Sequence, residues 1–246
     1  MRALLTNDDG IDAYGLALLA DLAAPCCDEI VIVAPSGNRS GKGQALTLDE
    51  DIIFTEIAEN RYSCSGTPVD CVLLAMNRLY KDGLPDILLS GINHGMNAAD
   101  DVGYSGTIGA AKEAAIWGVR SIAFSQRSGK SEADFEPART AGSMILEHAL
   151  AQPWQGRTVL NVNFPSAREG AVKGMLAGPL DHHKLADVVL DGHTSDSYRI
   201  GPMHMRQDTD AGSDRAILDA GYASMTPIKL DSTDRALLTS LNPLTL

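Results

Sequence analysis

The stretch MRALLTNDDG, residues 1–10, places a short apolar run directly before four turn-forming residues. An apolar run between a charged residue and a turn is typical of a strand buried on both faces of a parallel sheet. Asn7, Asp8, Asp9 and Gly10 therefore follow the carboxyl end of that strand, where open α/β sheets bind their ligands. Two adjacent carboxylates repel each other unless a cation or a proton intervenes, and a hard divalent metal ion is the natural partner. Taken alone, such residues are equally typical of a simple turn.

The composition describes an ordinary globular chain with an excess of acid. Of its 246 residues, 44% are hydrophobic and 5% aromatic, and the formal net charge is −12. This charge opposes binding to nucleic-acid polymers and to anionic membranes, so we expect neither as a partner. The four cysteines lack CxxC spacing, and no run of 18 apolar residues or signal-like segment is present. We therefore expect reduced thiols, no signal peptide or membrane span, and a cytoplasmic location.

Apolar strand patterns alternate with helical ones along residues 1–165. Strand patterns recur at 29–35, 87–90, 120–125 and 158–165, and helical patterns at 16–24, 67–80, 105–117 and 135–152. This alternation predicts an α/β fold with a doubly wound, mostly parallel, Rossmann-like sheet. The segments at 44–48, 51–57 and 61–65 are short and alternating, and they predict an antiparallel strand and hairpin at the margin of the sheet.

The character of the sequence changes beyond residue 165. Strand-like stretches at 186–190 and 194–201 flank an Asp191-Gly192 turn, and residues 213–228 read as a short helix and a final strand. We therefore divide the chain into a metal- and phosphate-binding core, residues 1–165, and a C-terminal segment, residues 166–246, that forms oligomers through its hairpin. The adjacent His182 and His183 lack metal-ligand spacing, and we expect both at the surface.

Polar residues follow several of the predicted parallel strands, and these strand ends meet at one edge of the sheet. Asn38 and Ser40 follow the second strand, and Asn93 and Asn97 follow a later one. Carboxylate, hydroxyl and amide oxygens together suit Mg²⁺ or Mn²⁺. Each of these residues is also common in loops for purely conformational reasons.

Two predicted helix starts are candidate anion sites. Ser105 is a good N-cap, and Gly106 and Thr107 carry first-turn amides. Such amides lack partners within the helix, so they and the helix dipole together favour binding of an anion. At the other start, Thr67, Pro68 and Asp70 each have a capping role, so we favour a structural cap there over a phosphate site.

Five motifs, in order and spacing, resemble the SurE family of survival-protein nucleotidases. The resemblance covers residues 1 to about 230, although 166–215 match only loosely. The motifs are TNDDG (6–10), VAPSGNRSGKGQALTL (33–48), GTPVDC (66–71), LLSGINHGMNAADDVGYSGTIGAAKEA (88–114) and GYASMTPI (221–228). The stretch Ser36-Gly37 replaces an acidic and a basic residue that the family usually carries, which affects the loop rather than the metal site.

The resemblance implies a 5′/3′-nucleotidase, a phosphoric monoester hydrolase that releases phosphate from nucleoside 5′- and 3′-monophosphates. It implies one divalent metal ion per subunit and a cytoplasmic homodimer or homotetramer that exchanges its C-terminal segment. By the resemblance, Asp8 and Asp9 are catalytic. The implied metal ligands are Asp8, Asp9, Ser40 and Asn93, and the implied phosphate contacts are Asn97, Ser105, Gly106 and Thr107.

Rival interpretations differ in how well the residues fit them. Haloacid-dehalogenase phosphatases separate their two aspartates by one residue, whereas Asp8 and Asp9 are adjacent, and no GxGxxG for a nicotinamide cofactor follows the first strand. A non-catalytic nucleotide-binding sensor and an exopolyphosphatase would use the same ligands, so both stay open. Direct attack by water and attack by Asp8 or Asp9 also stay open.

Overall fold

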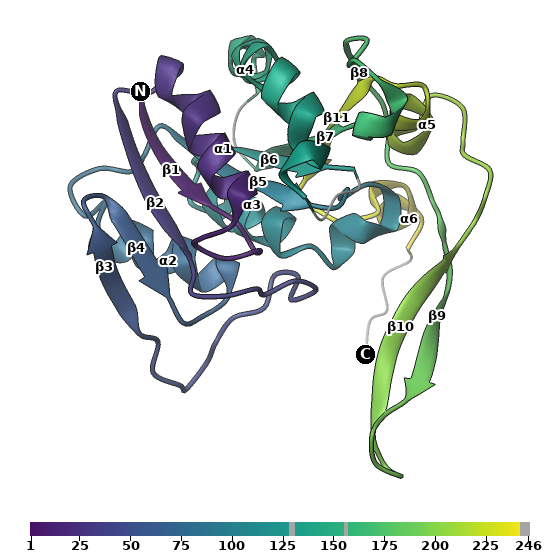
Figure 1. The fold of residues 1–246 in the computed structure, drawn as a ribbon, viewed down its shortest axis with the longest axis horizontal. Coiled ribbons are helices and arrows are strands. Elements are labelled where there is room, and N and C mark those ends of the chain that lie inside the picture. Colours follow the sequence, from purple (N-terminus) through teal and green to yellow (C-terminus); the bar gives the residue numbers. More distant parts are fainter. Residues whose placement is uncertain (128–130, 155–156, 242–246) are drawn as a thin grey trace.

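The computed structural model describes residues 1–127, 131–154 and 157–241, and it has one large mixed sheet with helices on both faces (Figure 1). The sheet has nine strands, and a separate antiparallel pair projects from the body. In spatial order the nine strands are β3 (Phe54–Ala58), β4 (Arg61–Cys64), β2 (Glu29–Pro35), β1 (Arg2–Thr6), β5 (Ile87–His94), β6 (Arg120–Gln126), β7 (Thr158–Phe164), β11 (Ala223–Lys229) and β8 (Met175–Ala177).

The centre of the sheet is parallel and its margins are mixed. Strands β4, β2, β1, β5, β6 and β7 are all parallel to their neighbours in that series. The β3–β4 and β7–β11 pairs are antiparallel, and β8 pairs in parallel with β11. The doubly wound, mostly parallel α/β fold predicted from the sequence is therefore confirmed.

Two hydrophobic clusters cover the two faces of the sheet. On one face, α1 (Tyr14–Ala23) and α4 (Glu136–Ala151) pack beside each other over a cluster that contains Leu5 (Figure 1). On the other, α2 (Pro68–Arg78) and α3 (Gly106–Ile116) pack together over a cluster that contains Leu4. Successive strand residues point to opposite faces, so the apolar run of β1 serves both clusters, which explains why it is continuous rather than alternating.

The predicted cap of α2 is confirmed in detail. The amide of Asp70 donates to the Thr67 hydroxyl, and the Asp70 carboxylate accepts from the amide of Thr67, a reciprocal arrangement that satisfies two helix-start donors. No helix in the described ranges is both long and apolar enough to cross a membrane.

The strand predicted at 44–48 is wrong. These residues form irregular loop, because their polar groups bond to the start of α2 instead of to a neighbouring strand. The amide and hydroxyl of Thr47 donate to the two carboxylate oxygens of Asp70, at 3.1 and 2.6 Å, and the Thr67 hydroxyl donates to the carbonyl of Ala45 at 2.8 Å. The predicted marginal hairpin itself forms, as β3 and β4.

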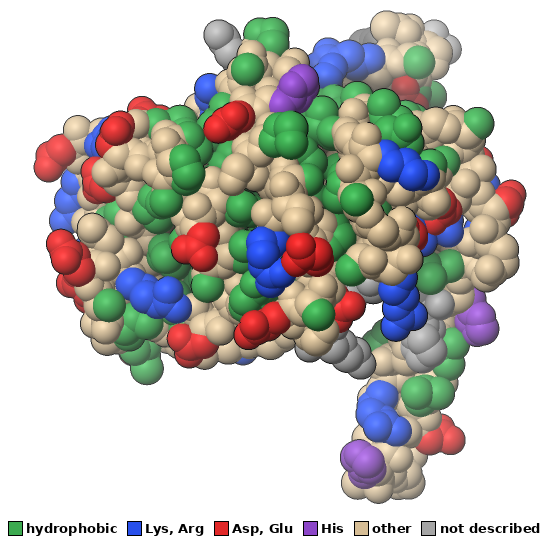
Figure 2. Space-filling view, turned by 45° about the horizontal axis from the view of Figure 1, so that its top comes forward, with side chains coloured by type: hydrophobic (Ala, Val, Ile, Leu, Met, Phe, Trp, Pro, Cys, Tyr) green, Lys and Arg blue, Asp and Glu red, His purple; other side chains and the backbone are tan. Residues whose placement is uncertain are grey.

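The C-terminal segment contributes both to the large sheet and to the projecting hairpin. Strands β8 and β11 extend the sheet beyond β7, and short helices α5 (Asp214–Asp219) and α6 (Arg235–Ser240) accompany them. The hairpin of β9 (Lys184–Asp191) and β10 (Tyr198–Met205) stands away from the body (Figure 2), and residues 192–197, rather than a tight Asp191-Gly192 turn, connect its strands. The division at residue 165 stays a prediction, and residues 242–246 of the predicted segment lie outside the described residues.

Four 3₁₀ helices link these elements in the described ranges. They are η1 (Ala24–Cys26), η2 (Ala99–Gly103), η3 (Glu132–Phe135) and η4 (Ala167–Glu169), and η2 leads directly into α3 at the carboxyl edge of the sheet.

Candidate functional site

Asp8 lies at the carboxyl end of β1 and is almost fully buried, with 3% of its surface exposed. The Thr107 hydroxyl donates a hydrogen bond of 2.6 Å to its Oδ1. Burial raises the pKa of the Asp8 carboxyl; the Thr107 hydrogen bond opposes this rise and the neighbouring Asp9 adds to it. Asp8 is therefore a carboxylate held in one orientation beside the start of α3.

The start of α3 lies against Asp8 because residue 106 has no side chain. A Cβ atom on Gly106 would lie 2.9 Å from Cβ and 3.0 Å from Oδ2 of Asp8. Ser105 caps the same helix, because its hydroxyl accepts a hydrogen bond of 3.1 Å from the amide of Ile108. The first-turn amides of α3 thus lie next to a buried carboxylate, at the strand edge where the sequence predicts an anion site.

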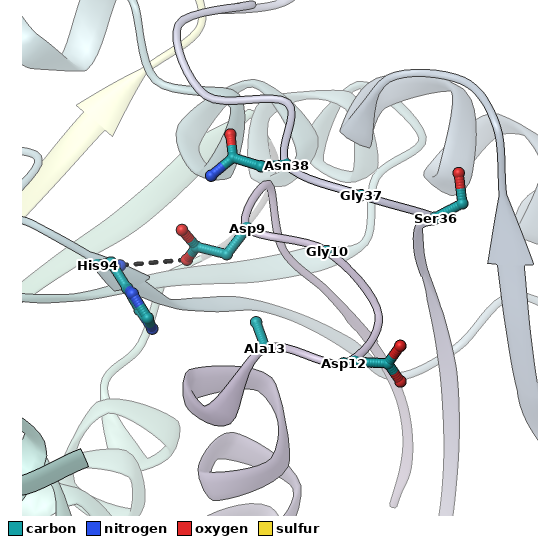
Figure 3. A pocket seen from close by; sticks show the side chains of 8 residues that line it. All are labelled: Asp9, Gly10, Asp12, Ala13, Ser36, Gly37, Asn38 and His94. Atoms are coloured by element: carbon teal, nitrogen blue, oxygen red, sulfur yellow. Dashed lines mark hydrogen bonds between the residues drawn. The ribbon is translucent and has the colours of Figure 1, made fainter. Parts of the chain in front are cut away.

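Asp9 lines a smaller cavity than the one that Asp8 lines. It lines a cavity of about 320 Å³ together with the loop that follows β2. The amide of His94 donates to Oδ2 of Asp9 at 3.1 Å, and the Asp9 carboxylate extends toward His94 while the Asp12 side chain extends away (Figure 3). Burial raises the pKa of the Asp9 carboxyl, and His94 opposes this rise through its charge and its backbone hydrogen bond.

The loop after β2 brings Ser40 to the same edge of the sheet. The amide of Arg39 donates to the carbonyl oxygen of Asp8 at 2.7 Å, which ties this loop to the end of β1. Asn38 then accepts a hydrogen bond of 2.8 Å from the amide of Ser40. Ser40 itself is exposed.

Asn93 is the penultimate residue of β5 and is buried, with 8% of its surface exposed. Its side-chain nitrogen donates to the carbonyl oxygen of Gly95 at 2.8 Å. This hydrogen bond orients the side-chain amide of Asn93. Because the nitrogen points at the Gly95 carbonyl, the side-chain oxygen points away from that carbonyl.

A cavity of about 740 Å³ brings together most of the residues that the sequence singled out. Of those residues, Asp8, Ser40, Asn93, Asn97 and Ser105 line it. Asp9 lines the adjoining smaller cavity, and His94 borders both. Thr107 is fully buried behind Asp8 and does not line either cavity, so its hydroxyl contacts the carboxylate rather than open space.

Asn97 is held by a polar cluster that the sequence reading missed. Its side-chain nitrogen donates to the Ser125 hydroxyl at 2.8 Å, and its backbone amide donates to Oδ1 of Asn163 at 2.8 Å. Its carbonyl oxygen accepts from Asn161 at 2.7 Å and from Asn163 at 3.2 Å. The sequence did contain a signal, because two asparagines at alternate positions of a buried strand need hydrogen-bond partners. Here both of their side-chain nitrogens donate to the carbonyl oxygen of one loop residue.

The donor set fits a hard divalent cation. Within the described ranges, neither Asp8 nor Asp9 forms an ion pair with a lysine or arginine, and burial makes their negative charge unfavourable. The described residues also contain no cluster of three or more His, Cys, Asp or Glu side chains suited to a metal. A metal at this edge would therefore rely on two carboxylates and on neutral hydroxyl and amide oxygens, which Mg²⁺ and Mn²⁺ accept.

The hairpin adds residues to the larger cavity that no motif indicated. Lys184, Asp187, Ile200 and Gly201 line it beside Tyr104. Lys184 is the nearest of the four to Tyr104 in the sequence, and 80 residues separate the two. No local pattern could have placed them there.

The expected surface position of His183 is wrong. Its imidazole is fully buried, and Nε2 lies 3.2 Å from Oδ1 of Asp101. The physical reason is that Oδ2 of Asp100 accepts the amides of His183 and Lys184, which draws the start of β9 onto η2 and covers the ring. His182 is exposed, as expected.

Comparison with known proteins gives one consistent result. A family model described as survival protein SurE matches residues 3–187. The 5′-nucleotidase SurE of Erythrobacter litoralis is 40% identical over 97% of this chain and 97% of its own length. The 5′-nucleotidase SurE of Vibrio cholerae is 42% identical over 98% of this chain and 96% of its own length. The crystal structure of the SurE protein from Aquifex aeolicus is similar, with a TM-score of 0.84 and 32% identity over 98% of both chains.

Proposed function

The chain belongs to the SurE family of nucleotidases, and we propose that it hydrolyses nucleoside 5′- and 3′-monophosphates to nucleoside and phosphate with a bound divalent metal ion. One observation carries the finer part of this proposal. The buried Asp8 carboxylate lies against the start of α3 and borders the same cavity as Ser40 and Asn93. This arrangement supports a cation site and an anion site side by side at the end of β1.

We assign the metal to four oxygen donors. Asp8 and Asp9 supply negative charge, and Ser40 and Asn93 supply a hydroxyl and an amide oxygen from the ends of two other strands. The Asn93 amide nitrogen is already bonded to the backbone, which supports its oxygen as the ligand atom. When bound, Mg²⁺ or Mn²⁺ neutralises charge on the phosphoryl group.

We assign the phosphate to Asn97 and the helix start Ser105 to Thr107. The first-turn amides of a helix and its dipole stabilise an anion, and developing charge on the phosphoryl oxygens benefits from the same donors. The cluster around Asn97 supports this role, because it fixes the loop backbone by three contacts in addition to the side-chain contact with Ser125.

We favour direct attack by water over attack by a carboxylate. In this route Asp8 or Asp9 accepts the proton of the attacking water. The nucleoside oxygen leaves with the electrons of the broken P–O bond and takes up a proton from solvent to become a hydroxyl. The configuration at phosphorus tests the choice. With a substrate whose phosphate is made chiral by oxygen isotopes, direct attack by water should invert the configuration, and retention would show a phosphoaspartate intermediate.

Phosphate release from AMP and GMP tests the proposed activity. Wild-type protein with Mn²⁺ should release phosphate, and chelator should abolish the release. Asp9→Asn should lower it by about 100-fold or more, because one of two charged donors becomes neutral. Binding of AMP without turnover would instead support a nucleotide sensor, and turnover of polyphosphate alone would support an exopolyphosphatase.

The location and assembly are separate proposals. We propose a cytoplasmic enzyme, supported by four cysteines that are all free thiols. We propose a homodimer or homotetramer, supported by the exposed apolar side chains of the hairpin, which include Leu185, Tyr198 and Ile200. Sedimentation of wild-type protein and of a variant with polar replacements at these positions tests the assembly.

A further inference from the structure

We propose that Tyr104 and Lys184 form the nucleoside subsite of this cavity, with the Tyr104 ring as the platform on which the base stacks. This inference rests on the proposed nucleotidase site and adds the recognition of the leaving nucleoside. It assigns a role in substrate choice to the hairpin, which extends beyond residues 3–187, the range that the family model matches.

The position of Tyr104 relative to the anion site is the first argument. Tyr104 directly precedes Ser105, the cap of α3, and consecutive Cα atoms lie about 3.8 Å apart. Both residues line the larger cavity, and Tyr104 is 52% exposed. A nucleotide whose phosphate binds the start of α3 therefore has an accessible aromatic ring within reach of its nucleoside.

The contacts of Lys184 are the second argument. Its Nζ lies 3.0 Å from the Tyr104 hydroxyl, 4.3 Å from the centre of the ring, and 2.7 Å from Oδ2 of Asp187. Hydrogen bonds to Asp187 and to Tyr104 raise the pKa of the Lys184 ammonium to about 12. Lys184 therefore stays charged, restrains the ring and joins it to the first strand of the hairpin.

The anchoring of the hairpin is the third argument. The amides of His183 and Lys184 both donate to Oδ2 of Asp100, at 2.8 and 2.9 Å, and the amide of Arg206 donates to the carbonyl oxygen of His183. Asp100 lies in η2, four residues before Tyr104. The same short segment thus holds the stacking ring and the strand that supplies its lysine.

The charges of the cavity favour a nucleoside over a chain of phosphates. Among its lining residues, all of which the structure describes, Lys184 is the one lysine or arginine, and it is paired with Asp187. Asp8, Asp101 and Asp187 are the acids. A polyphosphate extending from the anion site would meet more negative than positive charge, whereas a neutral nucleoside meets an aromatic ring and the apolar Ile200.

Product inhibition tests the two halves of the site separately. In the hydrolysis of AMP, adenosine probes the nucleoside subsite and inorganic phosphate probes the anion site. Tyr104→Leu should raise the inhibition constant of adenosine and the KM for AMP about tenfold, within the range that base–aromatic stacking contributes. The inhibition constant of phosphate should not change.

Matched variants separate stacking from a general disturbance. Tyr104→Phe keeps the ring and should retain adenosine binding to within about twofold. Lys184→Met should weaken adenosine about threefold, since the ring loses its restraint. The control is Lys173→Met, whose Nζ lies 5.9 Å from the centre of the Tyr222 ring, outside the cavity.

Three outcomes would overturn the subsite. They are an unchanged adenosine constant in Tyr104→Leu, an equal rise for adenosine and phosphate, and a Lys184→Met variant that weakens inhibition by tripolyphosphate but not by adenosine. If wild-type protein does not hydrolyse AMP, the proposed function fails by itself. In that case, calorimetry can still test the subsite by comparing the dissociation constants of adenosine for wild type and for Tyr104→Leu. Equal dissociation constants would overturn it.

Discussion

The Thr107 hydroxyl donates a 2.6 Å hydrogen bond to Oδ1 of Asp8, although 99 residues separate the two in sequence. The family resemblance assigns Thr107 to phosphate binding, and its amide keeps that position in the first turn of α3. Its side chain contacts the carboxylate instead. We therefore treat the Thr107 hydroxyl as a positioning group for Asp8.

Thr107→Val should lower activity while preserving the fold. Valine has nearly the same shape, so the loss isolates the hydroxyl. We expect kcat to fall about 10- to 100-fold and the Mn²⁺ concentration for half-maximal rate to rise, as is typical when a partner of a metal ligand is removed. Thr107→Ser should restore most of the activity. Equal Mn²⁺ dependence in Thr107→Val and wild type would contradict the positioning role.

Gly106→Ala should also disable the site. A Cβ atom at this position would meet Cβ and Oδ2 of Asp8 and Cγ of Pro68, the last at 3.1 Å, so either the carboxylate or the helix must shift. We expect kcat/KM for AMP to fall about 100-fold, as displacements near 1 Å do at reacting groups. Gly103→Ala is the control, because no atom lies within 4 Å of its Cβ position. Similar losses in both variants would argue against the specific contact with Asp8.

Asn163→Leu should weaken phosphate binding and destabilise the protein. The substitution leaves the amide of Asn97 without its acceptor in a buried setting, which costs about 1–3 kcal/mol of unfolding free energy. We expect KM for AMP and the inhibition constant of phosphate to rise together. Ser224→Ala is the control: Ser224 pairs with Asn163 across the β7–β11 ladder, and its buried hydroxyl has no hydrogen-bond partner. An unchanged inhibition constant of phosphate in Asn163→Leu would show that the cluster around Asn97 does not contribute to phosphate binding.

The Asp8 carboxyl should make the metal-free protein less stable as pH rises. Burial raises the pKa of the Asp8 carboxyl above its usual value of 3.8. The contribution of Asp8 to the free energy of unfolding is therefore fully present below pH 3.8, and it is lost as pH rises through the folded-state pKa. With chelator, we expect the Tm of wild-type protein, relative to that of Asp8→Asn, to decrease as pH rises above 3.8, and Mn²⁺ to reduce that decrease. Asp8→Asn should remove both the Asp8 contribution and its response to Mn²⁺. The same Tm profile with chelator and with Mn²⁺ would contradict this account.

Asp100 should control how firmly the hairpin is attached. Hydrogen bonds from the amides of Lys184 and His183 lower the pKa of the Asp100 carboxyl, against the opposing effect of burial. The contribution of Asp100 to the free energy of unfolding is therefore present above pH 3.8. It is lost as pH falls through the lowered folded-state pKa. Asp100→Ala should speed hydrogen exchange at these two amides at neutral pH, whereas Asp196→Ala, in the exposed loop of the hairpin, should not. Unchanged exchange in Asp100→Ala would show that other contacts hold the hairpin.

Local patterns predicted what depends on neighbours in the chain. Thr67 and Ser105 were predicted as N-caps, and both accept the expected amides, because a cap needs only the residues of its own first turn. The same locality explains the error at residues 44–48. The alternation of apolar and polar residues in this segment suits a strand. The polar groups of Thr47 instead bond to Asp70, which lies 23 residues away and is therefore outside any local pattern.

By itself, the sequence determined the alternation of strands and helices, the mostly parallel α/β fold class and the set of polar residues at the strand ends. Hydrophobic period and turn chemistry carry that information over a few residues at a time. Only the tertiary structure decided that Thr107 contacts Asp8, that Asn161 and Asn163 hold Asn97, and that Lys184 reaches Tyr104. These contacts join residues 64 to 99 positions apart, and they form because sheet order and hairpin docking, not neighbouring residues, place their backbones together.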